Sequence, residues 1–475
     1  MKRPALDAVV VGSGPNGLAA AITLQSKGLQ VLIIEEKDSI GGGLRSANLT
    51  LPGFIHDYCS SVYPLAVQSE FFRLIPLEKF GASFIYPPAF CAHPFTDGTA
   101  IVLYPEMSKT LLCLGADDKS YSALLEPLLG EWPSIKEAFL APLHYPNDPL
   151  SAIRFGLKGL LSAQNLSKRF YSGKMKAVWA AMAAHAMLPL DKLSTSAFAL
   201  MMLLMGHDKG WPIAKGGAQV LTDALGKYFL SLGGEIQTGT KVESLQQIPS
   251  SKAILLDLGP KQVLKIAGDQ FSSLFRSQLK SWHYGMGIYK VDWALSEPIP
   301  FSAKECRESA TVHLGNSIEQ IMAGEDQAWK GKMTDDPFII LTQPSLFDRR
   351  GPENRHTAWA YCHTPNGYSS SLTHVLEGQI ERYAPGFRDC ILARQESGPS
   401  ELEKYNSNYV GGDINGGSQN LSQLFSRPVL GWGPYKTSIP NLYMCSASTP
   451  PGGGVHGLCG FFAAKKAMRE IFHMS

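Results

Sequence analysis

Three glycines near the start of the chain have the spacing of a phosphate-binding turn. Gly12, Gly14 and Gly17 give a GxGxxG pattern directly after the apolar run Val9–Val11. In this pattern the first glycine permits a tight turn, the second lets backbone N–H groups approach a pyrophosphate, and the third lets the following helix pack close to the strand. The pattern predicts a dinucleotide site at a strand–turn–helix unit.

An acidic pair follows at the distance that such a site requires. A second apolar run, Val31–Ile34, ends in Glu35 and Glu36. An acid roughly 20 residues after the glycines binds a ribose hydroxyl in these sites. The order of strand, glycines, helix, strand and acid favours nucleotide binding over an ordinary turn. It also disfavours a secretory signal, because the glycines interrupt the apolar segment that a signal needs.

Two further glycine-rich segments extend the predicted site. Gly41–Gly43 would let a second loop approach the pyrophosphate, and Arg45 would neutralise it. Near the C-terminus, a strand at Leu442–Cys445 runs into the turn Pro450–Gly454, and a helix is expected to begin near Val455. The N–H groups at the start of that helix suit the pyrimidine edge of a flavin, which becomes anionic on reduction.

Few side chains near these turns are suited to proton transfer. His456 follows the last glycine turn, and His56 and Tyr63 follow the first glycine segments, so these three are the predicted catalytic residues. For His456 an equal alternative is a hydrogen bond to backbone at the helix start. Asp57 is interpreted as structural, and His185, within an apolar helix, as a core residue with a substrate-channel role left open.

Several other kinds of chemistry lack a basis in the sequence. The chain has no serine nucleophile elbow, no HExxH and no Walker lysine, which disfavours hydrolysis, zinc proteolysis and phosphoryl transfer. Its 8 cysteines include no CxxC, so neither a metal site nor a dithiol relay is predicted. A second GxGxxG unit for a nicotinamide nucleotide is also missing from the sequence.

Length and composition set the expected architecture. With 475 residues the chain exceeds a single core, and a discontinuous nucleotide-binding domain interleaved with a substrate domain is expected. The net charge of +2 disfavours nucleic-acid binding. The nucleotide-binding segments are predicted at 1–65, 210–260 and 430–475, and the substrate domain at 66–209 and 261–429 with a helical segment at 150–205.

The helical segment is basic as well as apolar. Between Asp148 and Asp191 there are 6 basic residues and no acidic one. The first interpretation of such a segment is a solvated helix face. The alternatives are a peripheral membrane contact, here placed at 150–190, and a cover over a channel for an apolar or acidic substrate. No apolar run reaches the roughly 18 residues of a membrane span. Together with the lack of a signal sequence, this predicts a cytoplasmic protein with membrane association as an option.

Four motifs give the sequence a family resemblance. They are VVVGSGPNGLAAA, IIEEKDSIGGG, WPIAKGGAQVLTDAL and LYMCSASTPPGGGVHG. With these, the chain resembles the FAD-dependent phytoene desaturase and amine oxidase superfamily, in particular a branch labelled pyridine nucleotide-disulphide oxidoreductase-like. The resemblance implies an α/β fold with a glutathione-reductase-like, Rossmann-type FAD-binding domain and a mixed α+β substrate domain.

The resemblance also assigns residues to FAD by position. The turn at the pyrophosphate would comprise Gly12, Gly14, Pro15, Asn16 and Gly17, and Glu35 and Glu36 would bind the adenosine ribose. The loop that closes over the phosphates would comprise Gly42, Gly43 and Arg45. Val242 would contact the adenine, and Gly454 and Val455 the isoalloxazine. Carotenoid desaturases often have Thr-His-Pro-Gly before the last helix, whereas this chain has Thr449-Pro450-Pro451-Gly452. A carotenoid substrate is therefore not assumed.

The function implied is an FAD-dependent oxidoreductase of the desaturase or dehydrogenase type. A lipophilic small molecule would give hydride to flavin N5, and O2, a quinone or a protein would accept the electrons. The alternatives are an amine oxidase, for which Lys215 is the candidate lysine, a flavin-dependent isomerase, and a non-catalytic flavin-containing binding protein.

Overall fold

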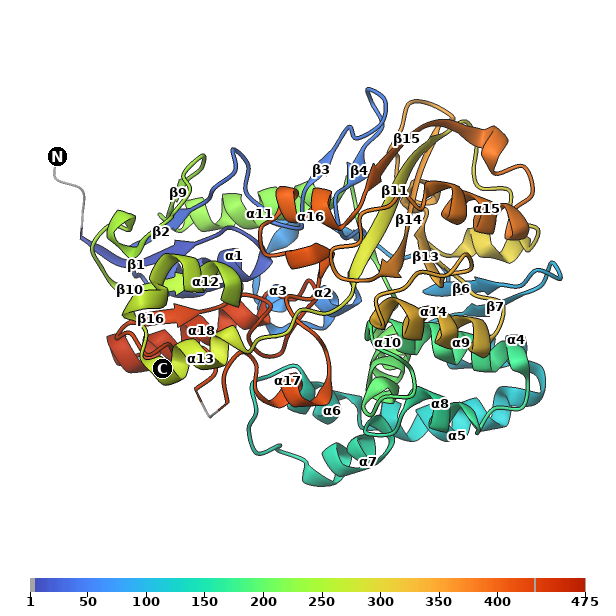
Figure 1. Ribbon diagram of the computed structural model, residues 1–475, viewed down its shortest axis with the longest axis horizontal. Coiled ribbons are helices and arrows are strands. Elements are labelled where there is room, and N and C mark those ends of the chain that lie inside the picture. The colour runs from blue at the N-terminus through green and yellow to red at the C-terminus, as the bar shows by residue number, and fades with distance from the viewer. Residues whose placement is uncertain (1–4, 431–432, 475) are drawn as a thin grey trace.

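The computed structural model describes residues 5–430 and 433–474, arranged around two large sheets (Figure 1). Residues 1–4, 431–432 and 475, which belong to the predicted nucleotide-binding segments, lie outside the described residues. In Figure 1 the two sheets lie side by side, the sheet of the N-terminal motif on the left and the larger one on the right.

The first sheet is parallel and collects strands from distant parts of the chain. In the described residues it has 5 strands in the order β16-β10-β1-β2-β9. All of its pairs are parallel. Their bounds are β1 (Leu6–Val11), β2 (Val31–Ile34), β9 (Glu235–Gln237), β10 (Ser251–Leu256) and β16 (Leu442–Met444). Parallel sheets are covered on both faces, which explains the unbroken apolar runs of β1 and β2.

Helices cover both faces of this sheet. On one face Ala8 and Val10 pack with α1 (Pro15–Gln25), α11 (Ala218–Ser231) and α18 (Leu458–Ala467). On the other face Val9 and Val11 pack with two further helices, α12 (Pro260–Ala267) and α13 (Ser273–Lys280). Alternate residues of one strand thus enter different cores, as the pleat requires. The predicted α/β Rossmann architecture is confirmed.

The second sheet is mainly antiparallel. In the described residues it has 7 strands in the order β15-β11-β14-β13-β12-β6-β7, with only the β12–β6 pair parallel. Their bounds are β6 (Cys91–Pro94), β7 (Ala100–Leu103), β11 (Gly287–Leu295), β12 (Thr311–Leu314), β13 (Ile339–Thr342), β14 (His356–Thr364) and β15 (Ile391–Ser397). One face packs on α15 (Thr373–Tyr383), leaving the other for the helical segment.

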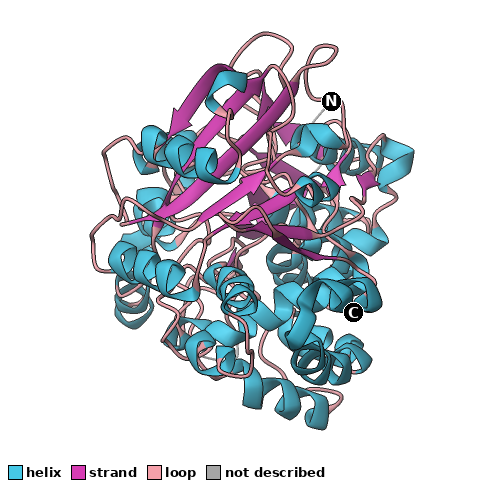
Figure 2. Ribbon diagram, turned by 90° about the vertical axis from the view of Figure 1, so that its right-hand side faces the viewer, coloured by secondary structure: helices cyan, strands magenta, loops and turns pink. Residues whose placement is uncertain are grey.

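A layer of helices lies below this second sheet in both ribbon views (Figures 1 and 2). It comprises α4 (Met107–Leu114), α5 (Asp118–Gly130), α6 (Trp132–Phe139), α7 (Pro149–Gly159), α8 (Ala163–Ser167), α9 (Gly173–Ala184), α10 (Thr195–Lys209) and α14 (Ile318–Trp329). α9 is buried on nearly all sides, which explains its Ala-rich sequence without a polar stripe. No helix in the described part of the chain is both long and apolar enough to cross a membrane.

Short elements join the two halves. The strands are β3 (Ser46–Ala47), β4 (His56–Asp57), β5 (Phe84–Ile85) and β8 (Ile213–Ala214), and the helices are α2 (Pro64–Gln68), α3 (Glu70–Leu74), α16 (Pro399–Tyr405) and α17 (Leu421–Phe425). All strands of the first sheet fall within the predicted nucleotide-binding segments. The domain limits themselves stay a prediction.

The last helix differs from the predicted one in its start. α18 begins at Leu458 rather than near Val455, because Gly457 precedes it with φ of 67°, a left-handed conformation that interrupts a right-handed helix. Gly457 also has little room, since a Cβ there would lie 2.7 Å from Phe71 and 2.9 Å from Ala19. Val455 therefore lies in the loop before the helix.

Candidate functional site

A cavity of about 770 Å³ lies between the two sheets. At one end it is lined by the glycine turn after β1, and at the other by side chains of β12, β13 and β14. The two ends are called here the nucleotide end and the pocket end. The carboxyl ends of parallel strands, where the nucleotide end lies, are the usual position for a ligand in an α/β sheet.

The glycine turn leaves space for a ligand by lacking side chains. Gly12 has φ of 98°, and a Cβ on Gly17 would lie 2.1 Å from the carbonyl oxygen of Gly12. A Cβ on Gly460 would lie 1.7 Å from the carbonyl oxygen of Asn16, so α18 also needs glycine to pack against α1. The first turn of α1 is thus held beside the cavity, where N–H groups and the helix dipole favour an anion.

Glu35 is buried at the end of β2 and accepts several hydrogen bonds. One carboxylate oxygen accepts from the Ser13 backbone N–H at 2.9 Å, and the other lies 3.2 Å from the Arg45 guanidinium. Arg45 also donates to the carbonyl groups of Ser39 and Ile40. These contacts show Arg45 holding the second glycine loop through Glu35, and its role at the phosphates stays a prediction.

The second glycine loop touches the first. A Cβ on Gly42 would lie 2.9 Å from the Cα of Gly14, and one on Gly43 would lie 2.2 Å from the Tyr409 hydroxyl oxygen. The Tyr405 hydroxyl donates to the Gly42 carbonyl at 2.6 Å. Because bulkier residues would push the loops apart, these glycines keep a narrow cradle for a pyrophosphate.

The predicted cofactor residues converge on this cavity. Those that line it are Gly12, Gly14, Pro15, Asn16, Glu35, Glu36, Gly42, Gly43, Arg45, Val242, Gly454 and Val455, whereas Gly17 lies beneath the turn. The side-chain oxygen of Asn16 is buried without a hydrogen-bond partner among the described residues, so it can accept from a hydroxyl group of a ligand. The cradle, the acid and this acceptor fit FAD.

An acidic residue at the nucleotide end was missed from the sequence. Asp257 directly follows β10, lines the cavity, and accepts a hydrogen bond from the Gly17 N–H at 2.9 Å. Burial, and to a smaller extent the Glu35 charge, raises its pKa to about 7, although the Gly17 and Gly14 N–H groups act in the opposite direction. The available signal was an aspartate ending the apolar run Ala253–Leu256.

His456 contacts backbone rather than the cavity. Its Nδ1 accepts from the Leu458 N–H at 2.9 Å, and its Nε2 lies 3.1 Å from the Gly452 carbonyl oxygen. Burial lowers its pKa to about 4, so the ring is neutral and Nε2 donates. These bonds hold the last glycine turn at the start of α18, and the catalytic role of His456 stays a prediction.

The other two predicted catalytic residues differ in their access to the cavity. His56 is buried outside the residues that line it, with Nε2 2.8 Å from the Thr50 hydroxyl and Nδ1 3.5 Å from an Asp292 carboxylate oxygen. Tyr63 does line the cavity, but its hydroxyl donates to the Ser60 carbonyl at 2.5 Å. A catalytic role for each likewise stays a prediction.

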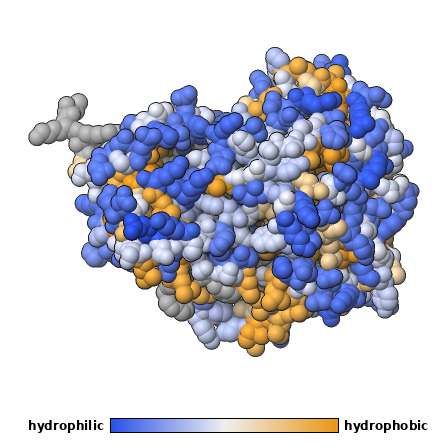
Figure 3. All heavy atoms as spheres, in the orientation of Figure 1, coloured by the Kyte–Doolittle hydropathy of each residue, from blue (hydrophilic) through white to orange (hydrophobic). Residues whose placement is uncertain are grey.

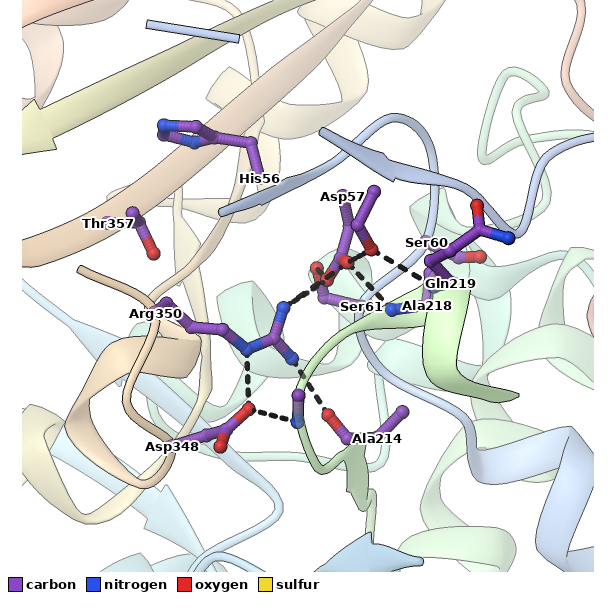
Figure 4. A network of polar contacts seen from close by, with 12 residues as sticks. His56, Asp57, Ser60, Ser61, Ala214, Ala218, Gln219, Asp348, Arg350 and Thr357 are labelled. Carbon is purple, nitrogen blue, oxygen red and sulfur yellow. Dashed lines mark hydrogen bonds and ion pairs between the residues drawn. The ribbon is translucent and has the colours of Figure 1, made fainter. Parts of the chain in front are cut away.

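Asp57 lies at the centre of a buried charge network (Figure 4). Its carboxylate is 3.1 Å from the Arg350 guanidinium and accepts from the Ala218 N–H at 2.8 Å. Arg350 also contacts Asp348 and donates to the Ala214 carbonyl. Burial would raise the pKa of Asp57, but Arg350 and these hydrogen bonds hold it below its usual value. The network ties β4, β8 and the start of α11 together.

A buried lysine lies close to the cavity, and it is not the one considered from the sequence. Lys215 is exposed. Lys290, on β11, is buried, pairs with Asp292, and donates to the Asp57 carbonyl at 3.1 Å. Its Nζ lies 4.9 Å from the ring centre of Trp359, which lines the cavity. Its charge is therefore satisfied behind the wall of the pocket end.

Comparison with known proteins agrees with this geometry. The family described as an NAD(P)-binding Rossmann-like domain matches residues 10–75. The mouse protein named pyridine nucleotide-disulfide oxidoreductase domain-containing protein 2 is 25% identical, with 99% of this chain and 95% of that protein covered. A neurosporene-forming phytoene desaturase of Rhodobacter capsulatus is 22% identical, with 95% and 92% covered.

Solved structures share the fold along the whole chain. Cyclohexylamine oxidase from Brevibacterium oxydans superimposes with a TM-score of 0.60 at 15% identity, covering 99% of this chain and 100% of that one. Over nearly its whole length the chain is thus similar in sequence to a phytoene desaturase and similar in fold to an amine oxidase. These similarities support an oxidoreductase, and FAD is the cofactor that its cradle fits.

Proposed function

We propose that this protein is a dehydrogenase or desaturase that oxidises a lipophilic small molecule and passes electrons to O2, a quinone or a protein. The observation that carries the proposal is the continuity of the cavity, which joins the nucleotide cradle to an apolar pocket end. Its apolar lining includes Val62, Leu65, Phe198, Met202, Trp211, Ile288, Ile340 and Ile414. Pockets of this kind bury most of a ligand and exclude water.

One set of residues would bind FAD, and another would bind the substrate and exclude water. FAD, when bound, supplies a hydride acceptor at N5. The glycine turn and the Gly42–Gly43 loop would hold its pyrophosphate, and Glu35 its ribose. The apolar side chains at the pocket end would orient the substrate in a dry space. No acidic side chain of the described residues lines that end, so the proton that is released along with the hydride would pass to His185 or to water rather than to a carboxylate.

An apolar surface on α7, which packs against the cavity-lining helix α10, supports delivery of the substrate from a membrane. Along α7 the exposed fractions are 65% for Leu150, 56% for Ile153 and 70% for Leu157. Their spacing places them on one helix face. Figure 3 shows a hydrophobic area at the lower edge of the molecule over this helix. Replacing the three residues by Ser is expected to reduce co-sedimentation with anionic vesicles, and unchanged co-sedimentation would contradict the membrane contact.

The experiment that tests the proposed function is spectroscopic. The purified protein is reconstituted with FAD, its visible spectrum is recorded, and the released cofactor is identified. Anaerobic titration with NADH and NADPH should leave the flavin oxidised, whereas a lipophilic donor should bleach it. Protein that takes up no FAD contradicts the cofactor, and rapid bleaching by NADPH contradicts the direction of electron flow.

The amine oxidase alternative has weaker support from the site. Lys215 does not line the cavity, and Lys290 is neutralised by Asp292. An isomerase would differ from a dehydrogenase in forming product without bleaching the flavin, so the same anaerobic titration separates the two.

A further inference from the structure

The pocket end has a floor made by one face of the second sheet. Thr311 on β12 lies opposite Thr342 on β13, which lies opposite Trp359 on β14. Two residues along, Ile340 pairs with Tyr361 on the same face. Alternate residues of a strand share a face, so the register brings these side chains into two adjacent rows. All five line the cavity.

One hydroxyl group on this floor is buried without a partner, and two more lie beside it. Within the described residues the side-chain oxygen of Thr311 makes no hydrogen bond, and Thr342 and Tyr361 line the cavity next to it. Thr311 and Thr342 are 4% and 2% exposed. Tyr361 lies on an inner strand of the sheet but is only half-buried, since it borders the cavity. A buried polar group without a partner costs free energy, so the unpaired hydroxyl of Thr311 indicates that a ligand with a polar group binds at this floor.

A neutral histidine lies beside this floor. His185, at the end of α9, lines the cavity, and its Nε2 is 3.1 Å from Nε2 of His313, which is on β12. Burial lowers the pKa of His185 to about 3 and that of His313 well below its usual value. The two neutral rings share one hydrogen bond, which leaves Nδ1 of His185 free to bond to a ligand.

Charged side chains line the other end of the cavity. Those among the lining residues are Glu35, Glu36, Lys37, Arg45, Lys241, Glu243, Asp257 and Lys265, all in the segments around β2, β9 and β10. Lys290 behind the floor is paired with Asp292. A carboxylate or ammonium group at the pocket end would therefore be buried without an opposite charge, which is strongly unfavourable.

We propose that the pocket end binds a neutral lipophilic molecule through one oxygen atom, a hydroxyl or a carbonyl, held by Tyr361 and His185. This inference rests on the proposed function, because it takes this cavity as the place where the substrate binds. Burial raises the pKa of Tyr361, so its hydroxyl keeps its proton and donates to the oxygen of the ligand. Tyr361 and His185 are thus specificity-determining residues, while the apolar walls bind the remainder of the molecule.

The test uses the FAD-loaded protein and a matched set of C8 probes. Octane, 1-octanol, 2-octanone, octanoate and octylamine are titrated, and binding is followed by perturbation of the flavin absorption spectrum. Octanol and octanone are expected to bind about tenfold more tightly than octane, because the free energy of one neutral hydrogen bond corresponds to a ratio of dissociation constants of that size. Octanoate and octylamine are expected to bind more weakly than octanol, because their charges would be desolvated without a partner.

A pair of tyrosine variants makes the test specific. Tyr361→Phe should bring the affinity for octanol close to that for octane while leaving the affinity for octane unchanged. Tyr383→Phe is the matched control, since Tyr383 is buried on α15 against the opposite face of the same sheet. It should preserve the tenfold preference for octanol.

The possible failures are distinguishable. Equal binding of octane and octanol by the wild-type protein would overturn this inference and leave the proposed function standing. An equal loss of affinity for octane and octanol in Tyr361→Phe would overturn the role of the Tyr361 hydroxyl and would also leave the proposed function standing. If the wild-type protein takes up no FAD, the proposed function fails, and the inference fails with it.

Discussion

The two ends of the cavity are built from different parts of the polypeptide. At the nucleotide end the cradle for the pyrophosphate is formed by backbone, and side chains are missing where they would intrude, as at Gly14, Gly17 and Gly42. At the pocket end the contacts come from side chains on strands brought together by register, such as Thr342 and Tyr361. Ligand binding at the nucleotide end therefore depends on the space that the glycines leave. Ligand binding at the pocket end depends on which side chains line it.

This difference has consequences for substitution. Adding one carbon atom at Gly17 or Gly42 should disrupt the fold, because the new Cβ would lie 2.1 Å or 2.9 Å from a backbone atom. Removing a hydroxyl at the pocket end should leave the fold intact and change ligand preference instead. The buried charges around Asp57 set a third kind of requirement, in which each charged group depends on its partner.

The largest effect is expected from breaking the buried charge network around Asp57. Arg350→Met would leave Asp57 and Asp348 without their cation, and their side chains are only 1% and 8% exposed. Loss of one partner of a buried pair costs about 3–5 kcal/mol in the free energy of unfolding. Urea unfolding measures this change. Arg355→Met, at an exposed site, is the control and should stay within about 0.5 kcal/mol of wild type.

The pH dependence of the same variant gives an independent check. In the wild type the folded pKa of Asp57 is lowered, so its stabilisation is present above pH 3.8, the usual value, and is lost as pH falls through the folded pKa. Without Arg350, burial dominates and raises the pKa. Stability of Arg350→Met should then fall as pH rises above about 4. A variant that keeps the wild-type pH profile would show that Arg350 does not set the charge state of Asp57.

At the nucleotide end, Gly17→Ala should have the next largest effect. The new Cβ would lie 2.1 Å from the Gly12 carbonyl oxygen, so strand and helix must separate. Overpacking of this kind costs about 3 kcal/mol, and FAD uptake should be lost with it. Gly173→Ala serves as control, because a Cβ there meets no atom within 4 Å. If Gly17→Ala has the same free energy of unfolding as the control, the close contact between the turn and α1 is contradicted.

The charge of Asp257 should tune FAD affinity by a smaller amount. Its carboxylate accepts from the Gly17 N–H beside the pyrophosphate cradle, and its pKa is about 7. The anionic pyrophosphate favours the protonated form, so FAD should bind best below pH 7 and weaken by up to about tenfold per pH unit above it. Quenching of FAD fluorescence at several pH values measures this. Asp257→Asn should remove the dependence, and a slope that persists in that variant would exclude Asp257 as its source.

The contrast between the two ends also explains what the sequence could predict. The glycine turn, the acid after β2 and the Gly42–Gly43 loop are local motifs, and each is visible within a few residues. The polar floor depends on the register of strands separated by helices and long loops, which no local pattern specifies. A signal did exist in the strand Thr357–Tyr361, where Trp359 and Tyr361 alternate with alanines, but pairing with Thr342 and Thr311 required the fold.

Buried polar residues were harder to interpret. A histidine beside a glycine turn has the same sequence context whether it faces a ligand or caps a helix, and the contacts of His456 are with backbone. Lys290 and Asp292 are two residues apart on β11, so they share a face and pair there. Their sequence, embedded in an apolar strand, gives no indication of which neighbours neutralise them.

The smallest predicted effect is that of the Thr311 hydroxyl, which should destabilise the fold but favour ligand binding. Thr311→Val removes a buried hydroxyl that has no partner among the described residues, with little change in shape. Removing such a group should raise the free energy of unfolding by about 1 kcal/mol. Thr110→Val is the contrasting variant, because the Thr110 hydroxyl bonds to both the N–H and the carbonyl of Tyr104, and its loss should be destabilising.

If Thr311→Val is also destabilised, the Thr311 hydroxyl is hydrogen-bonded within the protein, and the pocket end then has one fewer group that can bind a ligand. A gain in stability together with weaker octanol binding would instead show that this hydroxyl is kept for the ligand at the expense of the fold.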